Sequence, residues 1–232
     1  MPIFRLNHEL IFPHPGQADE SGLLAIGGDL SAARILLAYT VGIFPWFNSD
    51  EPILWWSPDP RFILEPENFH CSRSLRKTLR RGYYQVTLNR DFDGVLHGCA
   101  STPRQGQSGT WLGQEMREAY RELFRLGYAH SVETWHENDL VGGLYGLTLG
   151  QCFFGESMFS LQPDASKVAL ACLVEHLREL DFKLIDCQMP TDHLASLGAH
   201  GVSREKYLQL LREAGVVPGG ISDPPSFKID EK

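Results

Sequence analysis

Two polar side chains interrupt the apolar segment Lys183–Met189. Asp186 and Gln188 stand two residues apart in it. Side chains at that spacing on a β-strand project from the same face, about 7 Å apart, so we expect both to point the same way. Because polar groups in an apolar strand need hydrogen-bonding partners, the pair either bonds loops at the strand end or forms part of a reactive site.

A single acidic residue, Glu156, interrupts the aromatic segment Phe153–Phe159. A carboxylate buried without a partner either destabilises the folded protein or becomes protonated. Glu156 therefore either lies exposed on a sheet edge or faces a cation. Its place inside an aromatic strand favours the cation.

A basic stripe follows Ser72, formed by five cations at three- and four-residue intervals: Arg73, Arg76, Lys77, Arg80 and Arg81. On a helix it is about 15 Å long. The whole chain carries a net charge of -8, which repels polyanions, yet residues 61 to 110 hold eight basic and four acidic side chains. Such a concentrated stripe is typical of phosphate contacts, although a helix face exposed to water has the same pattern.

Aromatic side chains gather near proline- and glycine-rich turns, where Trp46, Trp55, Trp56 and Trp111 lie. Rings in such loops can stack on unpaired nucleotide bases. The other interpretation of each tryptophan is an ordinary core residue.

Several common site chemistries are missing from the sequence. It contains no GxxxxGK[ST], GxSxG or HExxH motif, no CxxC pair among its five cysteines, and no two histidines at metal-ligand spacing. A nucleotide triphosphatase, a classical serine hydrolase and a zinc protease are therefore disfavoured, and we expect no metal site, no cofactor and reduced thiols.

Nothing in the sequence indicates a membrane or an export route. The apolar run at residues 168–174 is far shorter than the roughly 20 residues that span a bilayer. The first residues have neither a basic start with an apolar stretch nor an Arg-rich amphipathic leader, so we expect a cytoplasmic protein.

Periodicity and capping residues predict the elements that position these side chains. We expect helices over 32–41 after Ser31, over 72–81, over 114–126, from Asp164 to about Leu180, and from Ser203 to Gly215. We expect strands over 62–64, 84–88, 130–135, 140–147, 152–159 and 183–189. The three strands between 130 and 159 are predicted to form an antiparallel meander.

This order of elements predicts an α+β protein with a mostly antiparallel, mixed sheet flanked by helices. Proline at positions 45, 52, 58 and 60 marks residues 1–61 as a small, loop-rich N-terminal domain. The main domain is expected over 62–217, followed by a loosely held tail over 218–232.

Together, the motifs resemble the bacterial leucyl/phenylalanyl-tRNA-protein transferases. The resemblance runs in one order and spacing from about residue 10 to about residue 215 and rests on Gly22–Leu30, Gly42–Phe47, Leu54–Arg61, Gly109–Trp111, Gly155–Ser160, Ile185–Gln188 and His193–Ala199.

The resemblance implies an enzyme that takes leucine or phenylalanine, and methionine less well, from the charged tRNA, with leucyl-tRNA and phenylalanyl-tRNA as its main donors. The acceptor is a protein with an N-terminal arginine or lysine, which the N-end rule pathway then degrades. The implied main domain has a GNAT-like acyltransferase fold without acetyl-CoA. In agreement, residues Leu161–Ala165 do not form the [RQ]xxGx[GA] pyrophosphate loop.

The resemblance also implies roles for residues. Gln188 would orient the attacking amine, Asp186 would hold Gln188 and take part in proton movement, and Glu156 would face the cationic acceptor. The apolar slot for the donor amino acid would be formed by Leu144, Phe153, Met158, Leu170 and Ile185, with Trp46, Trp111 and Tyr120 as further substrate-binding residues. The basic stripe would bind the tRNA phosphates.

Two other functions are compatible with parts of the pattern. An acetyl-CoA-dependent N-acetyltransferase would need the missing pyrophosphate loop. A non-catalytic tRNA-binding module would explain the basic stripe and the tryptophans, but it leaves Glu156, Asp186 and Gln188 without a role.

Overall fold

The computed structural model describes residues 3–102, 112–220, 223–224 and 227. The N-terminal part forms a four-stranded sheet in the order β1-β2-β4-β3, in which only β1 and β2 run parallel. Its elements are β1 (Phe4–Leu6), a 3₁₀ turn (Pro15–Gln17), β2 (Leu23–Gly27), α1 (Ala32–Thr40), β3 (Phe44–Pro45) and β4 (Leu54–Trp56).

A seven-stranded sheet in the order β11-β5-β10-β9-β8-β7-β6 follows. Every neighbouring pair is antiparallel except β9 and β10, which run parallel. Its strands are β5 (Arg61–Leu64), β6 (Gln85–Leu88), β7 (Ala129–His136), β8 (Asp139–Leu149), β9 (Cys152–Ser160), β10 (Leu184–Gln188) and β11 (His200–Val202).

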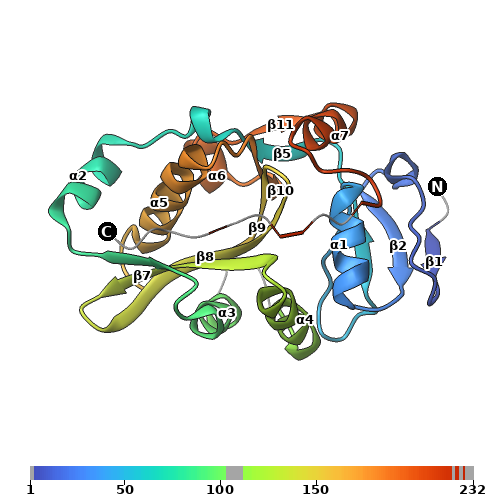
Figure 1. The fold of residues 1–232 in the computed structure, drawn as a ribbon, viewed down its shortest axis with the longest axis horizontal. Helices are drawn as coiled ribbons and strands as arrows, with labels where there is room; N and C mark the ends of the chain where they lie inside the picture. Colours follow the sequence, from blue (N-terminus) through green and yellow to red (C-terminus); the bar gives the residue numbers. More distant parts are fainter. Residues whose placement is uncertain (1–2, 103–111, 221–222, 225–226, 228–232) are drawn as a thin grey trace.

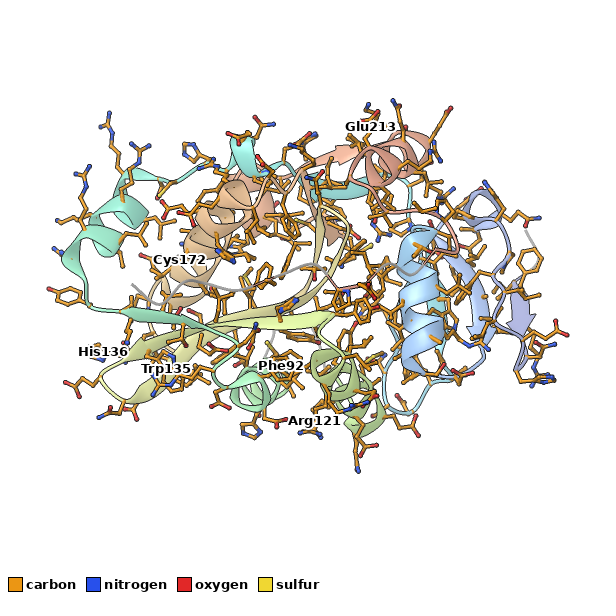
Figure 2. The ribbon with its side chains drawn as sticks, viewed as in Figure 1. Phe92, Arg121, Trp135, His136, Cys172 and Glu213 are labelled. Atoms are coloured by element: carbon orange, nitrogen blue, oxygen red, sulfur yellow. The ribbon has the colours of Figure 1, made fainter. Side chains whose placement is uncertain are left out.

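Helices cover both faces of this sheet (Figure 1). They are α2 (Arg73–Arg81), α3 (Phe92–Ser101), α4 (Gln114–Arg125), α5 (Ala165–Glu179), α6 (Asp192–Ser196) and α7 (Arg204–Glu213), with a 3₁₀ turn at Pro66–Asn68. Helix α5 packs on one face, and α3 and α4 pack on the other. Figure 2 shows the same division, with Cys172 on the α5 side and Phe92 and Arg121 on the opposite side.

The predicted architecture is confirmed: a small N-terminal sheet unit precedes a mixed, mostly antiparallel sheet flanked by helices. The predicted meander is present as β7, β8 and β9. Helix α3 was missed because its two glycines weaken the helical pattern. Gly98 is required there by close packing, since a Cβ atom would lie 2.6 Å from the Phe159 ring.

One capping prediction is wrong. Asp164 precedes α5, but its backbone is left-handed at φ 64° and its side chain does not bond the helix N-terminus. The carboxylate instead pairs with Lys167 at 2.9 Å and accepts a hydrogen bond from Thr78 at 3.4 Å. In contrast, Ser31 and Ser203 cap α1 and α7 as the sequence predicts, and Ser72, which the prediction placed inside the helix, caps α2.

A continuous apolar core joins the N-terminal sheet to the main sheet, because Tyr39 and Trp55 belong to the same cluster as Phe154 and Tyr120. The predicted loose tail contains a buried residue. Phe227 is 5% exposed and packs against His130, Phe153, His176 and Phe182.

The described helices include none that is both long and apolar enough to cross a membrane.

Candidate active site

A cavity of about 900 Å³ opens where the parallel strands β9 and β10 separate. Their pairing runs from Leu184 opposite Cys152 to Asp186 opposite Phe154 and then ends. The residues that follow on both strands, Gly155–Met158 and Cys187–Met189, line the cavity. The end of strand pairing therefore creates the opening between two strands of one sheet.

The cavity wall is mostly apolar. All five side chains predicted to form the donor slot line it: Leu144, Phe153, Met158, Leu170 and Ile185. Trp46, together with Phe44 and Pro45, closes the side that belongs to the N-terminal unit. The cavity has the shape and polarity to take an apolar side chain.

Glu156 is one of the polar groups on the wall. Its carboxylate accepts a hydrogen bond from the Tyr39 hydroxyl and another from the Tyr120 hydroxyl, each at 2.6 Å. Burial raises the pKa of Glu156 to about 7, although the two tyrosine hydrogen bonds oppose that shift. Glu156 therefore changes charge near neutral pH.

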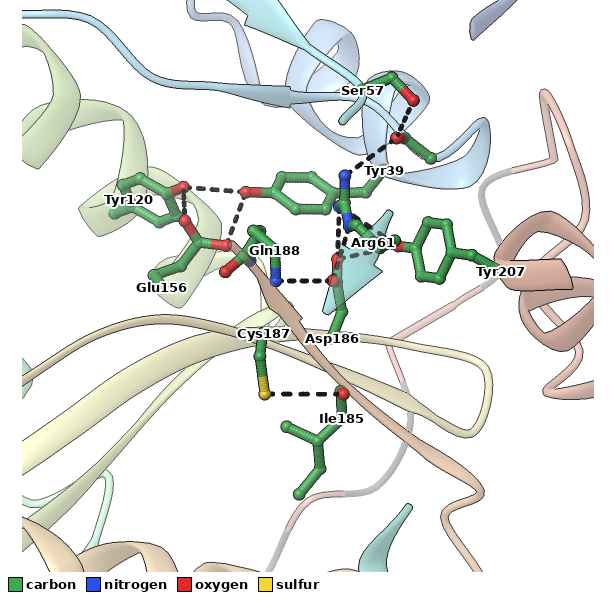
Figure 3. A network of polar contacts seen from close by, with 11 residues as sticks. Tyr39, Ser57, Arg61, Tyr120, Glu156, Ile185, Asp186, Cys187, Gln188 and Tyr207 are labelled. Atoms are coloured by element: carbon green, nitrogen blue, oxygen red, sulfur yellow. Dashed lines mark hydrogen bonds and ion pairs between the residues drawn. The ribbon is translucent and has the colours of Figure 1, made fainter. Parts of the chain in front are cut away.

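Asp186 lies behind the cavity wall. It is fully buried and is not among the residues that line the cavity. Its Oδ1 accepts hydrogen bonds from Arg61 Nε and the Gln188 backbone N–H, at 2.8 and 3.0 Å. Its Oδ2 accepts from Arg61 Nη2 and the Tyr207 hydroxyl, at 2.6 and 2.8 Å (Figure 3). These four bonds fill the acceptor positions of a carboxylate, so none is left for a substrate.

Gln188 does line the cavity, and its backbone is unusual. Its φ of 54° lies in the left-handed region, and the pairing of β10 with β5 shifts between Asp186 and Gln188. The strand is therefore irregular at this point, whereas the sequence predicts a regular one. The Gln188 side chain is 9% exposed, and its buried Nε2 has no hydrogen-bond partner among the described residues.

The other aromatic side chains predicted to bind substrate do not all lie at the cavity. Tyr120 is fully buried and does not line the cavity, but its hydroxyl bonds Glu156 and its ring packs on Tyr145, so it supports the wall without forming it. Trp55 is a core residue whose Nε1 donates to the Gly27 carbonyl. Trp56 donates to the Trp46 carbonyl at 2.6 Å, which holds the Trp46 segment against β4. The predicted contact at Trp111 lies outside the described residues.

The five cations of the basic stripe all lie exposed on α2 and together line a shallow hollow. None of them forms an ion pair with a residue in the described ranges. Helix α2 lies at the end of the molecule opposite the N-terminal unit, away from β10 (Figure 1). The stripe and the cavity are therefore separate surfaces.

Three residues of the site, Tyr39, Arg61 and Tyr207, were missed from the sequence. The one local signal was the charged side chain of Arg61, which stands at the start of the otherwise apolar segment Arg61–Leu64. Tyr39 and Tyr207 resemble ordinary apolar-face residues of their helices. Within the described ranges, no three His, Cys, Asp or Glu side chains are grouped so as to hold a metal ion.

Family models and curated relatives identify the chain. The model described as leucyl/phenylalanyl-tRNA protein transferase matches residues 63–212, and the model of the N-terminal domain of these proteins matches residues 28–59. The transferase of Syntrophotalea carbinolica is 56% identical over 232 residues, which is 100% of both chains. That of an Anaeromyxobacter species is 55% identical over 214 residues, covering 92% of this chain and 91% of the relative.

These matches define an aminoacyltransferase, an enzyme that moves an amino acid from tRNA to a protein. The chain belongs to the leucyl/phenylalanyl-tRNA protein transferase family.

Solved structures also match at low identity. A GCN5-related N-acetyltransferase from Kribbella flavida has a TM-score of 0.39 at 8% identity, covering 71% of this chain and 58% of its own. The L-PGS structure from Bacillus licheniformis has a TM-score of 0.37 at 14% identity, covering 74% and 57%.

Proposed function

We propose that the enzyme transfers leucine or phenylalanine, and methionine less well, to proteins that begin with arginine or lysine. The observation that carries this proposal is the apolar cavity between β9 and β10, with Glu156 and Gln188 on its wall. The enzyme takes the amino acid from leucyl-tRNA and phenylalanyl-tRNA, and these donors place the reaction in the cytoplasm. The elongated product carries an N-terminal residue that marks it for degradation by the N-end rule pathway.

The reaction needs positioning more than activation, because an aminoacyl ester is already reactive. The acceptor nitrogen bonds to the ester carbonyl carbon, the bond to the ribose oxygen breaks, and the amine proton replaces the acyl group on that oxygen. An N-terminal amine has a pKa of about 7.7 to 8.0, so part of it is unprotonated at neutral pH. Holding the amine against the ester therefore supplies much of the acceleration.

Gln188 is the group we assign to this positioning. Its carbonyl oxygen can accept a hydrogen bond from the attacking amine. Its Nε2, which has no partner among the described residues, can donate to the oxygen that becomes negative in the tetrahedral intermediate. Asp186 acts through Gln188, since all of its acceptor positions are occupied by protein groups.

Glu156 selects the acceptor. A cationic side chain near its carboxylate favours the ionised form, so binding of arginine or lysine lowers the pKa of Glu156 and forms a charge-assisted contact. A neutral acceptor gains no such contact and leaves the carboxyl group partly protonated at pH 7.

The test is transfer from radiolabelled leucyl-tRNA to four peptides that differ only in the first residue. We expect incorporation into peptides beginning with Arg or Lys and at most one tenth of that into peptides beginning with Ala or Glu. In the same assay, the Gln188→Ala variant serves as the enzyme that lacks the positioning group. Its transfer rate should be about 100-fold lower than that of the wild type. Equal incorporation into all four peptides would refute the acceptor assignment.

The same assay separates the proposal from acetyl transfer. Acetyl-CoA replaces leucyl-tRNA as the donor, and peptide masses are measured. We expect a mass increase of one leucyl residue with the tRNA donor and no acetylated peptide. Acetylation at a comparable rate would favour the N-acetyltransferase.

A further inference from the structure

The side chain of Arg61 contacts three separate parts of the fold (Figure 3). It is 1% exposed, and its Nε and Nη2 donate to the two oxygens of Asp186 in β10. Nη1 donates to the carbonyl of Gly42, which follows α1, at 3.3 Å. Nη2 also donates to the hydroxyl of Tyr207 in α7, at 3.3 Å. One guanidinium group therefore links the N-terminal unit, the main sheet and the last helix.

Arg61 also supports one wall of the cavity. The rings of Phe44 and Tyr207 both lie with their centres 4.6 Å from the guanidinium carbon. Phe44 begins the segment that reaches the cavity through Pro45 and Trp46. A displacement of the guanidinium group would therefore move this wall.

The opposite wall depends on the same side chain through Asp186. The oxygen that accepts from Arg61 Nε also accepts from the backbone N–H of Gln188. That bond holds Gln188 at a φ of 54°, which a non-glycine residue rarely adopts without a fixed partner. Without a fixed Asp186, Gln188 would relax toward a regular strand and turn its amide away.

The charge on Arg61 is secured by this pairing. Burial disfavours the charged form, but the Asp186 carboxylate outweighs it and raises the pKa of Arg61. Neither residue is among those lining the cavity. Arg61 therefore acts on the reaction only through its neighbours.

We propose that Arg61 is a positioning residue that sets the distance between Gln188 and the Phe44–Trp46 wall. This inference rests on the proposed function in one respect, because it takes Gln188 to be the group that orients the reactants. It adds that the N-terminal unit contributes to catalysis through the Gly42 carbonyl, which accepts a hydrogen bond from the ion-paired Arg61, beyond the surface it lends to the cavity.

The test compares Arg61→Lys with Arg34→Lys. Arg34 is a matched control, since it is also fully buried and pairs with an aspartate, Asp29, at 3.1 Å. It likewise donates to a backbone carbonyl, that of Asn7, at 2.8 Å, but it does not line the cavity. Both variants keep the positive charge and lose the planar guanidinium group, so both should lower the melting temperature.

We expect Arg61→Lys to lower kcat at least tenfold and to raise KM for leucyl-tRNA several-fold, measured well below the melting temperature of either variant. Arg34→Lys should keep kcat within twofold of the wild type. A folded Arg61→Lys enzyme with wild-type kcat and KM would overturn the inference, as would an equal loss of kcat in both variants.

If Arg61→Lys does not fold, the Tyr207→Phe variant tests the same inference. It keeps the ring against the guanidinium and removes the hydroxyl that donates to Asp186. A fall in kcat of threefold or more in the folded variant supports the inference, and a wild-type kcat overturns it. Wild-type transfer to Arg-peptides is measured alongside, so that a failure of the proposed function is seen separately.

Discussion

At the scale of single residues, the site separates two carboxylates by their surroundings. Asp186 pairs with an arginine and has no acceptor position left. Among the described residues, Glu156 has only tyrosine hydroxyls as hydrogen-bond partners, and burial raises its pKa to about 7. Glu156 is therefore the group whose charge responds to pH near neutrality.

The first prediction concerns the pH dependence of transfer. Glu156 ionises as the pH rises through about 7, so transfer to an Arg-peptide should increase across that pH in addition to the rise from amine deprotonation. Glu156→Gln should lose this inflection and keep only the one due to the amine. Tyr39→Phe removes a hydrogen bond that lowers the pKa of Glu156, so its inflection should move to higher pH. An unchanged profile in Glu156→Gln would show that another group titrates.

The same shift has a consequence for stability. The folded pKa of Glu156 lies above the reference value of 4.5, so the folded protein binds more protons than the unfolded chain between pH 4.5 and about 7. The free energy of unfolding should therefore fall as the pH rises through that window, by about 3 kcal/mol from this group alone. Urea unfolding across pH should show a smaller decline in Glu156→Gln, and an equal decline would contradict the assignment.

At the scale of elements, the feature that matters is the separation of β9 and β10. Two parallel strands that stop pairing leave backbone and side chains free to face a substrate, and α5 covers the apolar end of the opening. Helix α2 is a separate element that lies away from β10 (Figure 1). Its five exposed cations have no acidic partners in the described ranges, in contrast to Arg121 and Arg125 of α4, which pair with Asp93 and Glu122.

The second prediction tests α2 as the tRNA-binding element. Arg76→Ala combined with Arg80→Ala should weaken binding of leucyl-tRNA and reduce the log–log salt slope by about 2, because two phosphate contacts are lost. Arg121→Ala combined with Arg125→Ala removes the same charge from α4 and should leave the slope unchanged. Fluorescence titrations over a salt series measure both.

A short donor provides the control for chemistry. An aminoacyl-adenosine lacks the acceptor stem and cannot reach α2, so the α2 double variant should use it as well as the wild type does. If full-length tRNA binds the α2 double variant with unchanged affinity and slope, α2 is only a solvated face and the tRNA lies elsewhere.

At the scale of the whole molecule, the N-terminal unit and the main sheet form one core and share the cavity between them. Gly42 lies where α1 meets α7, with a φ of 78°. A Cβ atom there would lie 2.7 Å from Leu208 Cδ2 and 3.2 Å from the Tyr207 ring. The contact between the two parts therefore requires glycine for two reasons, its backbone conformation and its lack of a side chain.

The third prediction separates these two reasons. Gly82 has a similar φ of 64°, but a Cβ atom at this position would meet no other part of the described chain within 4 Å. Gly82→Ala should therefore lower the free energy of unfolding by about 1 kcal/mol, from backbone strain alone. Gly42→Ala should lower it by roughly 2 to 3 kcal/mol, because Leu208 must also move. Urea denaturation measures both, and equal losses would show that α7 does not press on this turn.

Much of the fold could be predicted from the sequence because local structure depends on nearby residues. The serines at positions 31, 72 and 203 cap helices through bonds to backbone groups three residues away, and alternating apolar residues define the meander. The apolar lining of the cavity was also predicted, through the resemblance to the family. Short elements such as β1 and β11 were missed because three residues carry too little periodicity.

The sequence by itself determined which residues are unusual for their surroundings: Glu156, Asp186, Gln188 and the basic stripe. Only the tertiary structure decided how they are used. Asp186 meets Arg61 across 125 positions, and Glu156 meets Tyr39 across 117 positions. The left-handed backbone of Gln188 accompanies a shift in pairing with β5 and a hydrogen bond to Asp186. Such contacts follow from topology, which brings distant segments together, so the spacing of residues within one strand could not reveal them.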